Sequence, residues 1–99
     1  MRSRAEMARY QVVHWNEIPS LVEAFDGAGA AHRPLSQRFQ DLIDAVAMRD
    51  GASDTDAYLD GWGRTAEVER PGTAQAVAEE VAAELEAEFE DLVTRRLGR

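Results

Sequence analysis

The chain has 99 residues, a formal net charge of −8 at pH 7 and no cysteine. A chain of this length forms one domain around a small hydrophobic core. The lack of cysteine excludes disulfides, thiolate metal sites and a cysteine nucleophile, and the negative charge argues against nucleic acids and anionic membranes as partners.

The N-terminal stretch MRSRAEMARY contains arginines but no apolar segment of the kind found in secretory signals, and nowhere is an apolar run long enough to cross a membrane. We therefore expect a cytoplasmic protein in which residues 1–7 form a flexible tail. All eleven basic residues are arginine and alanine is abundant. We interpret both features as compositional bias.

Two strands are predicted near the N-terminus. The stretch ARYQVVHW, residues 8–15, alternates with a period of two and is rich in β-branched and aromatic side chains. Pro19 ends this pattern, and SLVEAF, residues 20–25, predicts a second strand before the loop sequence DGAGAA. Both strands carry apolar groups on both faces, so neither face is expected to be in contact with water alone.

The segment after Pro34 predicts the most regular helix. In LSQRFQDLIDAVAMRDG, Ser36 suits the N-cap position and Gly51 the C′ position. Its apolar residues fall on one helical face: they are Phe39, Leu42, Ile43, Val46 and Ala47. We expect this helix to cover one face of a small, mainly antiparallel sheet.

A second, shorter helix is predicted to begin near Ser53. Ser53 and Asp56 have the spacing of a capping box, and Gly61 and Gly63 favour an exit from the helix. The apolar side chains that follow the cap lie within one helical turn of each other, which indicates that they pack together.

Residues 56–67 also partly match a calcium-binding loop, with acids or glycine at its first, fifth, sixth and twelfth positions. The third position is Tyr58 and the ninth is Arg64, and neither suits the ligation of a cation. The sequence therefore predicts no metal site here.

The C-terminal third predicts a short edge strand and one long helix. RTAEVE, residues 64–69, alternates until Pro71 ends it, and the chain from Thr73 to Leu97 is rich in alanine and glutamate. A helix of about 25 residues spans about 37 Å, which exceeds the reach of a compact domain of this size. We expect residues 72–99 to form an acidic interaction arm.

The candidates for contact with a protein partner are the tryptophan that ends the first strand and the apolar stripe of the long helix. These residues are Trp15, Val77, Val81, Leu85, Phe89, Leu92 and Val93.

The segment HWNEIP gathers an imidazole, an amide and a carboxylate at the end of the first strand. His14, Asn16 and Glu17 are therefore candidates for ligand binding or catalysis, although a turn with a solvated acid explains them as well. The glycine pair of DGAGAAH lacks the third glycine of a nucleotide-binding fingerprint. No catalytic triad or phosphate-binding lysine stands out, so the sequence predicts no enzyme, cofactor or metal.

Four short patterns between residues 10 and 64 resemble the small bacterial virulence factor domain family, whose domain also occurs in conserved virulence factor C proteins. They are Trp-x-Glu-Ile-Pro at 15–19, Leu-Ser-x-Arg-Phe at 35–39, Ile-Asp-x-x-Ala-Met-Arg at 43–49 and Asp-Ala-Tyr-Leu-x-x-Trp at 56–62. The resemblance implies no catalytic residues. It suggests an accessory role beside enzymes of cobalamin- and folate-linked methyl transfer. The family's basic segment after the second strand is reduced here to Arg33.

We thus predict an α+β domain of order β-β-α-α-β-α, with a virulence-factor-like domain over residues 8–71 and a helical arm over 72–99. The first functional hypothesis is a non-catalytic accessory subunit that binds a larger cytoplasmic enzyme, because no catalytic group of residues is evident and the long helix carries an apolar stripe. The alternatives are a ligand-binding or catalytic protein acting at the His14–Glu17 strand end, and a structural homodimer.

Overall fold

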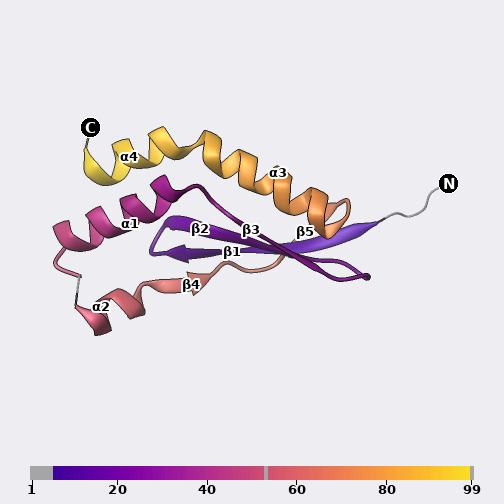
Figure 1. Ribbon diagram of the computed structural model, residues 1–99, viewed down its shortest axis with the longest axis horizontal. Coiled ribbons are helices and arrows are strands. Elements are labelled where there is room, and N and C mark those ends of the chain that lie inside the picture. The colour runs from indigo at the N-terminus through magenta and orange to yellow at the C-terminus, as the bar shows by residue number, and fades with distance from the viewer. Residues whose placement is uncertain (1–5, 53, 99) are drawn as a thin grey trace.

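The structure is a computed structural model that describes residues 6–52 and 54–98. It confirms the α+β class, with five strands and four helices in the described part of the chain. The elements are β1 (Met7–Trp15), β2 (Ile18–Phe25), β3 (Ala30–Pro34), α1 (Gln37–Arg49), α2 (Thr55–Asp60), β4 (Trp62–Arg64), β5 (Val68–Pro71), α3 (Ala74–Ala87) and α4 (Phe89–Leu97). The molecule is elongated, with extents of 53 × 28 × 19 Å (Figure 1).

The sheet is antiparallel, with the order β3-β2-β1-β4, and β5 also pairs with β1. The predicted strand over residues 64–69 is in fact two short strands that share one edge of β1, since β4 pairs with its end at Trp15 and β5 with its beginning at Met7. The predicted tail over residues 1–7 ends earlier than expected. Met7 belongs to β1, and the carbonyl of Glu6 accepts a hydrogen bond from Gly72 N–H at 3.0 Å.

The predicted loop DGAGAA is a hairpin turn followed by β3. The Asp26 carboxylate accepts hydrogen bonds from the N–H groups of Ala28 and Gly29 at 2.8 and 2.9 Å, which closes the chain into a tight turn. The same carboxylate accepts from Ala74 N–H at 2.7 Å, so it also anchors the beginning of α3. β3 was missed because its alanines and proline carry little strand propensity; its pairing with β2 holds it in place.

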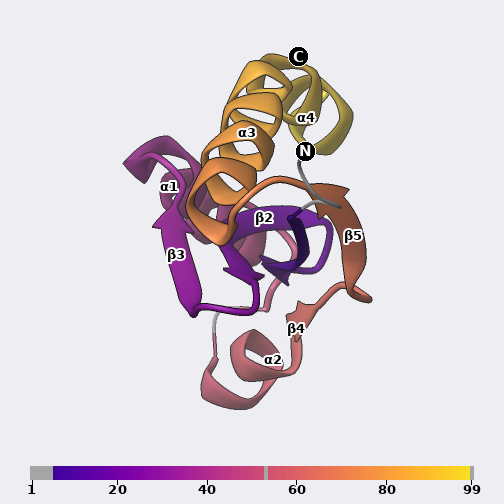
Figure 2. The ribbon, with the colours of Figure 1, turned by 90° about the vertical axis from the view of Figure 1, so that its right-hand side faces the viewer.

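α3 covers the sheet, and this corrects the prediction that the helix around Phe39–Val46 does so. α3 packs along β1, β2 and β3, whereas α1 lies at one end of the strands and packs on α4 as well as β2 (Figures 1 and 2). The contact face of α3 includes Ala74, Ala78 and Ala82, which are all buried. Small side chains let a helix lie close to a sheet, so these alanines have a packing role that compositional bias alone does not explain.

The single C-terminal helix of the prediction is divided at Glu88, the residue that ends α3 and precedes α4. α3 follows the sheet, and beyond the bend α4 packs on α1, where the rings of Phe39 and Phe89 meet edge to face at 4.9 Å. The apolar stripe therefore packs within the chain rather than extending as an arm. Truncation after Pro71 would remove part of the core, so it does not test for a partner.

α2 begins at an N-cap that differs from the prediction. The Asp54 carboxylate accepts a hydrogen bond from Ala57 N–H at 3.0 Å, while Asp56 lies in the first turn and Ser53 lies outside the described residues. For α1 the predicted ends are confirmed, because Ser36 is the N-cap residue and Gly51 follows the C-cap with φ of +74°. No helix in the described part of the chain is long and apolar enough to cross a membrane.

Candidate functional site

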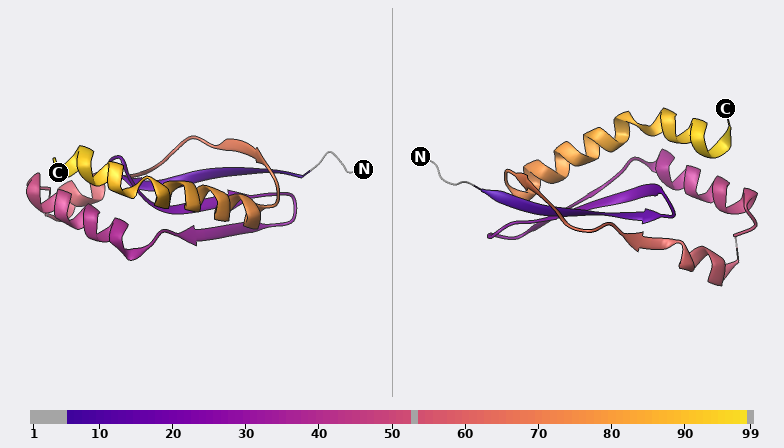
Figure 3. Two further views of the ribbon diagram at one scale, coloured as in Figure 1. Left: turned by 90° about the horizontal axis from the view of Figure 1, so that it is seen from above. Right: turned by 180° about the vertical axis from the view of Figure 1, so that it is seen from behind.

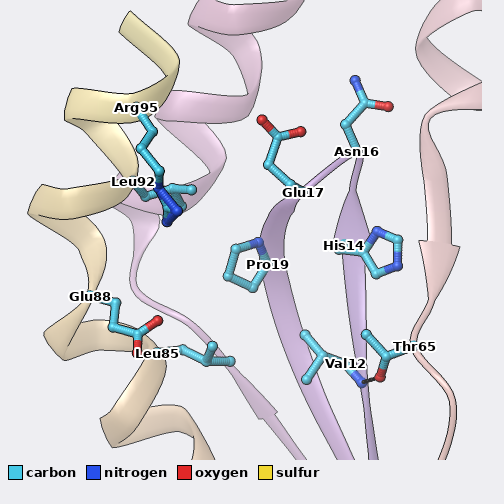
Figure 4. A pocket seen from close by; sticks show the side chains of 10 residues that line it. All are labelled: Val12, His14, Asn16, Glu17, Pro19, Thr65, Leu85, Glu88, Leu92 and Arg95. Atoms are coloured by element: carbon cyan, nitrogen blue, oxygen red, sulfur yellow. Dashed lines mark hydrogen bonds between the residues drawn. The ribbon is translucent and has the colours of Figure 1, made fainter. Parts of the chain in front are cut away.

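A cavity lies between the turn end of the β1–β2 hairpin and the bend that joins α3 to α4 (Figure 4). Its volume is about 320 Å³, near the lower limit of pockets that hold small molecules. The hairpin contributes Val12, His14, Asn16, Glu17 and Pro19, the helical side contributes Leu85, Glu88, Leu92 and Arg95, and Thr65 completes the lining.

The charged groups around the cavity nearly cancel. The Glu17 carboxylate forms an ion pair with the guanidinium of Arg96, which also contacts Asp50 at 3.1 Å. This contact ties the hairpin turn to α4, and Glu17 and Asp50 share the positive charge of Arg96. Glu88 and Arg95 are exposed and of opposite sign, so the charged lining residues together with Arg96 and Asp50 carry a small net negative formal charge.

Among the side chains that line the cavity, His14 has a buried polar atom without a hydrogen-bond partner. Its Nδ1 atom is buried and has no partner, and Figure 4 shows no hydrogen bond from the imidazole to the other lining residues. Thr65, in contrast, accepts a hydrogen bond from Val12 N–H at 2.9 Å. His14 lies opposite Gly63, where a Cβ atom would stand 3.3 Å from the imidazole Cε1, so the glycine leaves room for the ring.

Asn16 forms the turn between β1 and β2. It has φ of +51°, a left-handed conformation that asparagine tolerates better than most residues. Its N–H donates to the carbonyl of Gly61 at 2.8 Å. The backbone role of Asn16 is therefore clear, and its exposed side chain stands at the edge of the cavity.

The opposite side of the sheet is here called the open face, meaning the side chains of β1, β2 and β3 that point away from α3. Val22 and Ala24 are buried beneath α3, so by strand alternation Leu21 and Phe25 belong to the open face. Val13 pairs with Leu21 and lies beside it, whereas Phe25 lies beyond Glu23 on the same strand. α2 lies on this side at one end of the sheet, and no described helix covers the remainder (Figures 1 and 3).

A buried carboxylate lies among polar side chains on the open face. Glu23 is only 8% exposed. Its carboxylate accepts hydrogen bonds from Arg64 Nε at 2.9 Å and Gln11 Nε2 at 3.1 Å, and His32 Nε2 lies 3.8 Å away. The Arg64 hydrogen bond, followed by that from Gln11, lowers the pKa of Glu23 below its ordinary value. The group joins β1, β2, β3 and β4 across the sheet.

The structure brings together the three ligand candidates of the sequence, because His14, Asn16 and Glu17 all line the cavity. Of the candidates for partner contact, Leu85 and Leu92 also line the cavity, and the others lie elsewhere. Trp15 is 1% exposed and its indole N–H donates to the carbonyl of Tyr58 at 2.7 Å. Val77, Val81 and Leu92 are buried, and Leu85, Phe89 and Val93 are partly buried against the same core. The buried candidates Trp15, Val77, Val81 and Leu92 therefore stabilise the fold and offer little surface to a partner.

Sequence reasoning missed the helical side of the cavity and the importance of the open face. Arg95, Glu88 and Thr65 are distant from the hairpin in sequence, and no pattern links them to it. For the open face a signal was present, since Leu21 and Phe25 recur on one side of a predicted strand whose other side is also apolar.

The fold and these two surfaces define a small α+β domain with a helix-covered sheet, one open sheet face and a cavity at the helix bend. Residues 13–97 of the chain match the model of a protein family that is described as virulence factor. The chain therefore belongs to the virulence factor family. Comparisons with curated proteins and with solved structures found no significant match.

Proposed function

We propose that the protein is a non-catalytic accessory subunit in the cytoplasm, which binds a larger enzyme through the open face of its sheet. The observation that carries the proposal is the set of half-buried apolar side chains on that face. Val13, Leu21 and Phe25 do not belong to the core cluster packed under α3, so a partner could cover them without disturbing the fold.

The composition of the face supports this role. Water-facing sides of antiparallel sheets usually carry polar residues, whereas here three apolar side chains lie beside the Glu23 group on adjacent strands. On this face Glu23 lies between Leu21 and Phe25, so apolar side chains flank a hydrogen-bonded polar group. A mixture of apolar and hydrogen-bonded side chains is typical of protein interfaces.

The resemblance seen in the sequence gives the first enzymes to test, which are those of folate- and cobalamin-linked methyl transfer. The proposal itself requires only a partner with a complementary surface that is largely apolar. Because the chain is acidic overall, with a net charge of −8, basic residues around that surface would increase the rate of association.

The test is co-purification with a double variant, Leu21→Thr with Phe25→Thr. Threonine keeps the strand propensity of both positions while it removes the apolar contact area. The tagged wild-type protein is expected to retain a specific enzyme from a native lysate, and the double variant is expected to lose it. Reconstitution of the two purified proteins then confirms direct binding.

Met48→Thr is the matched control, because Met48 is an apolar residue on α1 with 72% exposure. Its variant should retain the partner. All variants must first show the melting temperature of the wild type. Retention of the partner by the double variant would contradict docking on the open face. A doubled mass in light scattering with no other partner would favour the homodimer instead.

A further inference from the structure

We propose that the cavity at the α3–α4 bend is a second binding site, which takes a small, uncharged, largely apolar molecule that carries a carbonyl group. The site is separate from the open face, since none of Val13, Leu21 and Phe25 lines the cavity. It therefore goes beyond the accessory function and stands or fails independently of it.

The volume of the cavity and its apolar lining indicate the size and the apolar part of the ligand. A volume of about 320 Å³ suits a molecule built on a single ring, since sites of this kind enclose most of the ligand's surface. Val12, Pro19, Leu85 and Leu92 supply apolar contact from both sides, from the hairpin and from the helical bend (Figure 4). A ring placed between them would replace water on apolar surface.

His14 indicates which polar group the ligand carries. A neutral imidazole carries hydrogen on one nitrogen, and a buried N–H without an acceptor is costly. Because Nδ1 is buried without a partner, the hydrogen is better placed on Nε2, which is not among the buried nitrogens without a partner. The imidazole then acts as a donor, and its natural partner is an acceptor such as a carbonyl oxygen. The hydroxyl of Thr65, whose oxygen already accepts from Val12 N–H, can add a second donor.

The charges select an uncharged ligand over a carboxylate. Glu17 and Asp50 share the positive charge of Arg96, and Glu88 and Arg95 offset each other. No net positive charge remains to hold an anion, and the net charge of −8 on the whole chain repels one. A ketone or amide meets the donors without these costs.

The test uses three probes that share one ring. Acetophenone has the carbonyl, toluene lacks it and benzoate replaces it with a charge. Each is titrated into the isotope-labelled full-length protein while amide and imidazole shifts are recorded by NMR. Acetophenone should shift Val12, His14 and Leu92 in a saturable manner. Toluene should bind about tenfold more weakly, as expected for one lost hydrogen bond. Benzoate should also bind more weakly than acetophenone, because its charge must leave water without a cation to meet it.

Each contrary result is informative. Equal binding of toluene and acetophenone would overturn the assignment of His14 as a donor, tighter binding of benzoate would overturn the uncharged class, and shifts confined to other residues would remove the site. These comparisons use the wild-type protein, so they do not depend on the folding of any variant.

A pair of histidine variants then tests the donor directly. His14→Phe keeps an aromatic ring and removes both nitrogens, so the preference for acetophenone over toluene should disappear. His32→Phe is the control, because His32 lies on β3 outside the cavity with its side chain 56% exposed. The preference should survive in that variant; its loss in both variants would overturn the role of His14. The Leu21 and Phe25 double variant should bind acetophenone normally even if it has lost its enzyme partner.

Discussion

At the residue scale, the packing of Trp15 explains why position 61 is a glycine. A Cβ atom at this position would collide with the indole ring of Trp15. The indole is held in place, because its N–H donates to the carbonyl of Tyr58 and the two rings stack with centroids 5.8 Å apart. The glycine that could suggest a calcium loop in the sequence is thus accounted for by the close packing of α2 on the end of β1.

Replacement of this glycine should therefore be costly. Gly61→Ala is expected to lower the free energy of unfolding by about 1–3 kcal/mol, because the buried indole must move to admit a methyl group. Urea denaturation followed by tryptophan fluorescence measures the loss. Gly29→Ala is the control, since a Cβ there meets nothing within 4 Å, and it should stay within about 0.5 kcal/mol of the wild type. Equal effects in the two variants would rule out the proposed collision.

At the scale of the elements, the small side chains on the buried face of α3 allow the helix to pack close to the sheet. Ala78 has no exposed surface, and Val77 beside it is also fully buried. The C-terminal end of α3 is held to α1 by Glu86, whose carboxylate accepts hydrogen bonds from Ser36 N–H at 2.6 Å and Ser36 Oγ–H at 2.8 Å. The helix is thereby positioned along the sheet before the chain bends into α4.

A larger side chain on that face should separate the layers. Ala78→Leu is expected to destabilise the fold by about 1–3 kcal/mol through overpacking, as measured by thermal or urea unfolding. Ala83→Leu places the same side chain on the exposed side of α3, and it should change stability by no more than about 0.5 kcal/mol. If Ala78→Leu proved neutral, the packing of α3 against the sheet would have to be looser than the structure shows.

For the whole molecule, carboxylates join elements that are distant in sequence. The pKa of Glu23 is lowered by Arg64 of β4, that of Asp26 by Ala74 N–H of α3, and that of Glu84 on α3 by Arg70 of β5. Burial raises the pKa of Glu86, but its hydrogen bonds from Ser36 and Arg38 outweigh this effect, and the pKa is lowered.

Lowering the pH should therefore reduce the stability of the whole fold. A carboxylate whose pKa is lower in the folded state adds stability above its unfolded pKa and loses it as the pH falls through the folded value. Melting temperature should be nearly constant from pH 7 to about 5 and should fall progressively below pH 4.5, the ordinary value for glutamate.

The variant Glu23→Gln tests the contribution of the central carboxylate. Glutamine keeps the size of the side chain and cannot titrate, so the acid-induced fall in melting temperature should be shallower than in the wild type. The same titration of Glu80→Gln serves as a control on an exposed acid of α3. An unchanged pH profile for Glu23→Gln would show that other groups dominate the acid response.

The sequence by itself determined the features that depend on neighbouring residues. The amphipathic spacing of Phe39 to Ala47 fixed α1 and its buried face, alternation fixed β1 and most of β2, and the chemistry at His14 to Glu17 indicated one wall of the cavity. Only the tertiary structure decided that Ala30–Pro34 forms a strand, that the C-terminal helix bends at Glu88, and that Leu92 and Arg95 form the opposite wall. Those features arise from hydrogen bonds and packing between segments far apart in the chain, which local periodicity cannot encode.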